Sequence, residues 1–231
     1  MLEQAFEALK VYDWGTDPKV LQPINAAIIE SHGNEDARQE LESRLTAILA
    51  SDTPRDAKDF VCRKLMLIGT DTSVPALAKL LPSQDDSHMA RYALERMPCD
   101  AAGDALRAAL GNVEPALQVG VISSLGARGD EKSVAQIGEL VSSDDAAVAT
   151  AAARALGAIG TADAAKALAE NQASSDQAKM AATDASFACA ESLLAHGKKA
   201  EAVAIYKAYI GSDQPKHIRT AATRGMLAGA K

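Results

Sequence analysis

The chain has 231 residues, of which 48% are hydrophobic, 24% are charged and only 3% are aromatic. This length suits one large domain or an array of repeats, and abundant alanine with few aromatic residues favours helices over strands. The formal net charge of -7 argues against a nucleic-acid-binding protein, because such proteins need a cationic surface.

The first segment, MLEQAFEALKVYDW, is predicted to form an amphipathic helix with Leu2, Phe6 and Leu9 on one face. It lacks the basic start and the continuous apolar run of a signal peptide. No run of 18 apolar residues occurs, so no membrane span is expected. A complete chain would therefore be cytoplasmic, whereas a fragment of a longer protein could be exported. Trp14, the sole tryptophan, is expected to plug the end of the core between the first two helices rather than to be a contact residue.

From about residue 30 onward the chain repeats one pattern of a helix-ending residue, an amphipathic run, a polar turn and a second helix. One helix pair cannot bury its own apolar faces, whereas stacked copies can, so the repetition predicts an array of helix pairs. The helix-ending residues are Gly33, Gly69, Pro98, Gly129, Gly160 and Gly197. The polar turns are SDTP (51–54), SQDD (83–86), NVEP (112–115), SSDD (142–145), SSDQ (174–177) and SDQP (212–215).

The turn residues predict where the helices begin. Asp, Ser and Asn offer side-chain oxygens to the unpaired N–H groups of a helix start, and proline fits the first helical turn. Amphipathic helices of period 3.6 are predicted over 54–68, 86–97 and 145–159, each ended by glycine or proline. No segment alternates with period 2 over the length of a strand, so the fold class is all-α.

The unit DDAAVATAAARALGAIGTADAAKALAE (144–170) resembles HEAT repeats, especially the short bacterial variety that also occurs in phycobilisome lyases. The resemblance extends over roughly residues 30 to 231 and implies a right-handed α-α superhelix, a HEAT-like solenoid of about six helix pairs. Segment 187–210 is instead similar to a tetratricopeptide pair. We expect a single repeat domain over 1–231, with N-terminal capping helices at 1–32, repeats at 33–213 and a terminal helix at 214–231.

The sequence contains none of the motifs that mark nucleophile elbows, phosphate loops, zinc sites or dinucleotide binding. Its four histidines stand alone, and the acidic turns suit helix capping better than calcium binding. Cys62, Cys99 and Cys189 have neither disulfide nor metal-ligand spacing and are expected to be small buried side chains. We therefore predict no catalytic residue, no metal and no cofactor, and a protein that is not an enzyme.

A basic and aromatic patch is predicted on the two helices that follow the first two polar turns. Adjacent helices of a stack would bring their exposed stripes together, and arginine and tyrosine are enriched at binding hot spots. The alternative is that Arg–Asp and Arg–Glu pairs only keep these helix faces soluble. The candidate partner-binding residues are Arg55, Arg63, His88, Arg91, Tyr92 and Arg96.

These features predict a protein–protein interaction scaffold that presents a concave, helix-lined surface to a protein or peptide. Two alternatives stay open: a lyase-like or tetrapyrrole-binding enzyme component, which the resemblance implies, and a structural spacer within a larger multidomain protein. Both termini carry apolar stripes, Leu2, Phe6 and Leu9 at one end and Ala222, Met226 and Leu227 at the other. Neighbouring domains or end-to-end self-association are expected to cover them.

Overall fold

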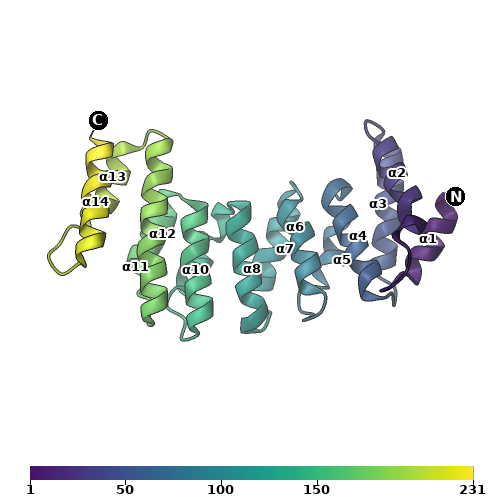
Figure 1. The fold of residues 1–231 in the computed structure, drawn as a ribbon, viewed down its shortest axis with the longest axis horizontal. Coiled ribbons are helices and arrows are strands. Elements are labelled where there is room, and N and C mark those ends of the chain that lie inside the picture. The colour runs from purple at the N-terminus through teal and green to yellow at the C-terminus, as the bar shows by residue number, and fades with distance from the viewer. Residues whose placement is uncertain (231) are drawn as a thin grey trace. The chain divides into compact units, whose positions relative to one another are not determined.

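The computed structural model describes residues 1–230, and these residues form helices and no strand (Figure 1). The all-α fold expected from the sequence is thus confirmed. The chain divides into two compact units, residues 1–117 and the part from residue 118 onward, and each is described by itself. The expected single domain with its three parts stays a prediction.

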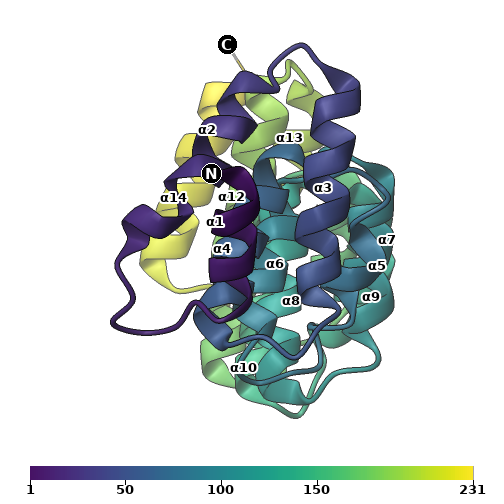
Figure 2. The same cartoon turned by 90° about the vertical axis from the view of Figure 1, so that its right-hand side faces the viewer.

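Unit 1 is a row of helix pairs that begins with two short N-terminal helices. Figure 2 shows that α5 and α7 lie on one side of this row while α4 and α6 lie on the other. The short polar turns let each helix fold back on the preceding one, and the stacked pairs share one core. The elements are α1 (Leu2–Lys10), η1 (Pro18–Leu21), α2 (Gln22–Glu30), α3 (Glu35–Leu49), α4 (Arg55–Ile68), α5 (Val74–Ala78), α6 (Ser87–Arg96) and α7 (Asp100–Leu110).

Unit 2 continues the same alternation with longer helices. Helix α10 packs on α12 (Figure 1). Helix α9 packs on α11, so the stacked helix pairs predicted from the repeats are present here too. The elements are α8 (Pro115–Arg128, which begins just before the boundary), η2 (Glu131–Ser133), α9 (Val134–Leu140), α10 (Ala146–Ile159), α11 (Ala162–Glu170), α12 (Asp176–Ala195), α13 (Lys199–Lys207) and α14 (Lys216–Gly229).

Side chains of two polar turns cap helices as predicted, Asp145 at α10 and Ser175 at α12, whereas α4, α6 and α14 have no side-chain cap. The Asp145 carboxylate accepts hydrogen bonds from the N–H groups of Ala147 and Val148 at the start of α10. Asp86 is an exception, because its buried carboxylate pairs with Lys58 of α4 at 3.0 Å instead of capping α6. The turn before α6 therefore ties two stacked helices together.

The helix ends depart from the prediction at one glycine. Gly160 ends α10 with φ +69°, the left-handed conformation that glycine adopts without strain. Gly69 ends α4 with φ -67°, a backbone conformation that any residue can adopt, so this position does not require glycine for its φ angle. A Cβ there would lie 2.5 Å from the carbonyl oxygen of Leu65, so close packing explains this glycine.

The N-terminal helix is confirmed as amphipathic, but its apolar face is already covered. Phe6 and Leu9 are buried, and the Arg44 guanidinium lies 3.8 Å from the centre of the Phe6 ring. Because Leu21 and Ile24 complete this end of the core, no space is left for Trp14. Trp14 is 93% exposed, so the predicted core plug was wrong.

Candidate functional site

The predicted patch of unit 1 lies on two packed helices, α4 and α6. Arg63 Nε donates to Asp59 Oδ2 at 2.7 Å on the exposed side of α4. This hydrogen bond and the Asp59 charge raise the pKa of the Arg63 guanidinium, and Tyr92 of α6 adds a smaller effect in the same direction. The Arg96 guanidinium lies 5.0 Å from the centre of the Tyr92 ring. Arg63, Tyr92 and Arg96 thus form one cluster.

The other patch residues are placed differently. Arg55 does not continue the predicted ladder with Asp59; its Nε lies 3.4 Å from the carbonyl oxygen of Asp85 at the start of the neighbouring helix. His88 is exposed near that same end. Arg91 is half-buried, and its burial lowers the pKa of its guanidinium while Glu95 opposes this change. Whether these six residues bind a partner stays a prediction.

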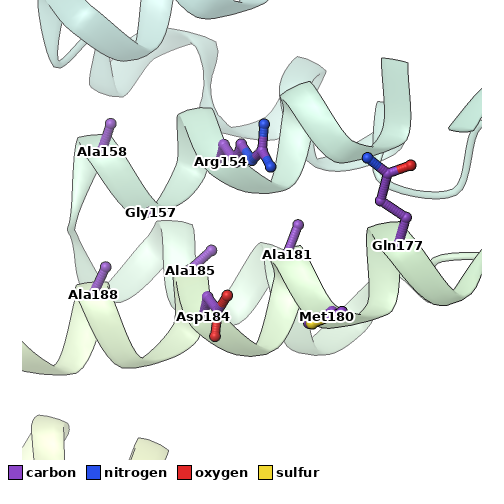
Figure 3. Close-up of a pocket in the computed structure, with 9 residues that line it drawn as sticks. All are labelled: Arg154, Gly157, Ala158, Gln177, Met180, Ala181, Asp184, Ala185 and Ala188. Carbon is purple, nitrogen blue, oxygen red and sulfur yellow. The ribbon is translucent and has the colours of Figure 1, made fainter. Parts of the chain in front are cut away.

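A second surface, which sequence reasoning missed, lies in unit 2 over α8, α10 and α12. One cavity of about 550 Å³ lies between α10 and α12, and Figure 3 shows its lining side chains. A second, of about 450 Å³, lies between α8 and α10. Arg154, Ala158 and Gln177 line both cavities, so we treat them as one groove, called the unit 2 groove.

Glycine and alanine form the floor of this groove because the helices approach closely there. A Cβ added at Gly126 would lie 2.8 Å from the Ala155 Cα, and one added at Gly157 would lie 2.9 Å from the Ala185 Cα. The same contact therefore recurs between successive helices. Its signal in the sequence is a glycine three residues before each of the helix-ending glycines of α8 and α10.

The groove combines this small-residue floor with a few polar side chains. Arg154 projects from α10, and Gln177, Met180 and Asp184 project from α12 (Figure 3). All four are exposed, and Met180 is an apolar side chain that is 64% exposed. The groove thus offers a floor of small residues, one positive and one negative side chain, and the flexible thioether of Met180. These features suit contact with a polypeptide better than catalysis on a small molecule.

No group of three histidine, cysteine, aspartate or glutamate residues within 1–230 is arranged to hold a metal ion. Two of the three thiols are buried in the cores. Burial is the largest effect that raises the pKa of Cys62 to about 12, and it raises the pKa of Cys189 to about 11. Cys99 is only half-buried, and burial raises its thiol pKa as well.

These environments predict a clear order of thiol reactivity. Only the thiolate attacks a disulfide reagent, so raised pKa values suppress reaction at mildly alkaline pH. We expect Ellman's reagent to modify Cys99 slowly in the native protein, and Cys62 and Cys189 only after addition of denaturant. A Cys99→Ser variant should show no native reactivity. Rapid native modification of two or three thiols would contradict the buried positions.

The family model described as HEAT repeats matches residues 103–186. Residues 103–186 are thus similar to HEAT repeats. The matched HEAT segment extends from α7 into α12 and contains the unit 2 groove apart from Ala188. The HEAT-like resemblance expected from the sequence is confirmed, whereas the tetratricopeptide-like character of 187–210 stays a prediction.

One similar solved structure is the crystal structure of an engineered protein. It is 20% identical to this chain, with a TM-score of 0.48, and the match covers 100% of this chain and 68% of the other. No curated protein matches the sequence. Within residues 1–230, no helix is both long and apolar enough to cross a bilayer.

Proposed function

We propose that this protein is a non-enzymatic interaction module that binds a polypeptide segment in the unit 2 groove. The observation that carries the proposal is that Arg154, Ala158 and Gln177 belong to both cavities of the HEAT segment. A groove that extends over α8, α10 and α12 offers contacts to several residues of one polypeptide segment. The groove lies on packed helices, and a rigid surface lowers the ordering cost of association.

The lining defines the chemistry of the proposed ligand. The glycine and alanine floor admits a closely lying backbone or a small apolar side chain. Arg154 provides a planar donor for a carboxylate, and Asp184 accepts from a basic side chain. The ligand is therefore a protein segment that carries apolar residues between an acidic and a basic group.

Filling the groove should abolish this binding. Ala158 is exposed and lines both cavities, so Ala158→Arg places a long charged side chain in the groove without disturbing the core. We expect the affinity for a partner isolated on the immobilised wild-type protein to fall by more than about tenfold, roughly 1.4 kcal/mol. Isothermal titration with the purified partner measures this change.

Two further variants make the test specific. Ala135→Arg introduces the same side chain at an exposed position of α9 outside the groove, and it should bind as the wild type does. Equal affinity of the Ala158→Arg and Ala135→Arg variants for the partner would refute the proposal that the partner binds in the unit 2 groove. In the same titration, Arg63→Glu combined with Arg91→Glu probes the unit 1 patch; unchanged affinity would leave that patch with a solubilising role only.

A further inference from the structure

Charge is distributed unequally along the sequence. Residues 1–40 contain eight acidic and three basic residues, and we call them the acidic N-terminal element. Residues 196–230 contain six basic and two acidic residues, and we call them the basic C-terminal element. Residues 196–230 thus carry a charge opposite in sign to the net charge of -7 of the whole sequence.

Helix α14 presents half of these basic residues on its uncovered side. Its other side packs on α13, where Ala222 is buried and Gly225 lies against the ring of Tyr206. A shallow groove of about 270 Å³ runs along the uncovered side and contains no acidic residue. Its lining residues are Lys216, Arg219, Thr220, Thr223 and Arg224.

One donor in this groove has no acceptor. The Nε atom of Arg219 is buried and finds no hydrogen-bond partner among residues 1–230. A buried donor without an acceptor is unfavourable, and an incoming carboxylate would supply the missing acceptor. Leu227 of the same helix is 61% exposed, so an apolar contact is available beside the cationic groove.

The acidic N-terminal element carries the complementary features. Trp14 is 93% exposed, and Val11 and Ile29 are 73% and 75% exposed. Asp13 and Glu30 directly adjoin Trp14 and Ile29 in the sequence, and both are exposed. Exposed tryptophan is a typical anchor of protein interfaces, and carboxylates are the ligands that a cationic groove attracts.

We infer that α14 of one copy docks on the acidic N-terminal element of a second copy. The partner is identified by this chain's own charge complementarity and by the exposed apolar residues on both surfaces. Opposite charges speed the encounter and fix its orientation, while burial of Trp14 and Leu227 adds a favourable apolar contribution. Two different surfaces meet, so the contact is heterologous: in a pair, one copy retains an unused N-terminal element and the other an unused α14. The inference does not depend on the unit 2 groove.

The first test uses the sole tryptophan as a reporter. Sedimentation velocity at rising protein concentration should show species larger than a monomer at low salt. The Trp14 emission should shift to shorter wavelength as these species form, because the ring leaves water. Raising the salt to about 1 M, where the Debye length is about 3 Å, should reverse both changes. A monomer with unchanged emission at every concentration would overturn the inference.

The second test exchanges the charges of the two surfaces. Lys216→Glu with Arg224→Glu makes the α14 groove acidic, and Asp13→Lys with Glu30→Lys makes the N-terminal element more basic. Each double variant alone should stay monomeric. An equimolar mixture should form a 1:1 complex, because the unchanged basic α14 of the second variant can dock on the unchanged acidic N-terminal element of the first.

A matched control separates this contact from a general effect of charge. Lys166→Glu with Lys179→Glu changes the net charge by the same amount at exposed positions of α11 and α12, and this variant should associate as the wild type does. A mixture that fails to form the 1:1 complex would overturn the inference. So would binding of an acidic peptide to α14 by a wild-type protein that stays monomeric, which would assign the groove to another protein.

Discussion

The Gly157→Leu variant is expected to lose about 3 kcal/mol of unfolding free energy, the upper part of the range for overpacked sites. Even the first added carbon would lie 2.9 Å from the Ala185 Cα, which is backbone and cannot move without displacing α12. A side chain at this position must therefore separate α10 from α12. Replacing a glycine inside a helix by a better helix former stabilises the helix by only about 1 kcal/mol. The steric clash is larger, so the variant is less stable than the wild type.

Denaturant unfolding followed by circular dichroism measures this loss, and hydrogen exchange locates it. Amides of α10 and α12 should exchange faster, while those of unit 1 should be unchanged. Gly111→Leu is the control, because Gly111 has φ -92° and a Cβ there would meet no atom within 4 Å. If both variants are equally stable, the close approach of the two helices does not exist in solution.

The Glu42→Ala variant is expected to destabilise unit 1 by about 3 kcal/mol. The Glu42 side chain is 2% exposed, and its Oε1 accepts a hydrogen bond from the Thr70 N–H at 2.6 Å. The Thr70 hydroxyl also donates to this carboxylate at 2.9–3.0 Å. Truncation leaves a backbone donor without its charged acceptor, and hydrogen bonds to charged groups contribute about 1.5–3 kcal/mol each.

Graded substitutions separate the contribution of the Glu42 charge from that of its hydrogen-bond acceptor. Glu42→Gln keeps one acceptor oxygen without the charge, so its stability should lie between the wild type and Glu42→Ala. Glu40→Ala removes an exposed carboxylate from the same helix and should change stability by less than about 0.5 kcal/mol. Equal urea midpoints for Glu42→Ala and Glu40→Ala would show that the link between α3 and the turn after α4 contributes nothing.

Local patterns made the helices predictable. The turn that contains Asp145, the glycine at 160 and the 3.6 period between them define α10 almost to the residue. The pattern is less informative for α5, which ends at Ala78 although the apolar residues Leu80 and Leu81 follow it. Pro75 and Pro82 both lie within or beside this short segment, so few backbone hydrogen bonds are available to extend it.

Contacts between different repeats were not predictable from those patterns. Glu42 and Thr70 are 28 residues apart, and nothing local marks this glutamate as the buried one in an acidic helix. The groove depends on which helix faces meet, and that follows from packing at Gly157 rather than from periodicity. Trp14 was misplaced for a related reason, because the volume available at the end of a core depends on all the side chains that fill it.

The sequential packing of the helices also determines how quickly each unit can fold. Helix α10 packs on α9, α11 and α12, so the segments that meet lie at most two helices away along the chain. Such neighbours give a low relative contact order, and little loop-closure entropy is lost before the first contacts form. Each unit should therefore fold on the microsecond to millisecond scale typical of helical proteins, and its apolar stripes are exposed to aggregation only briefly after synthesis.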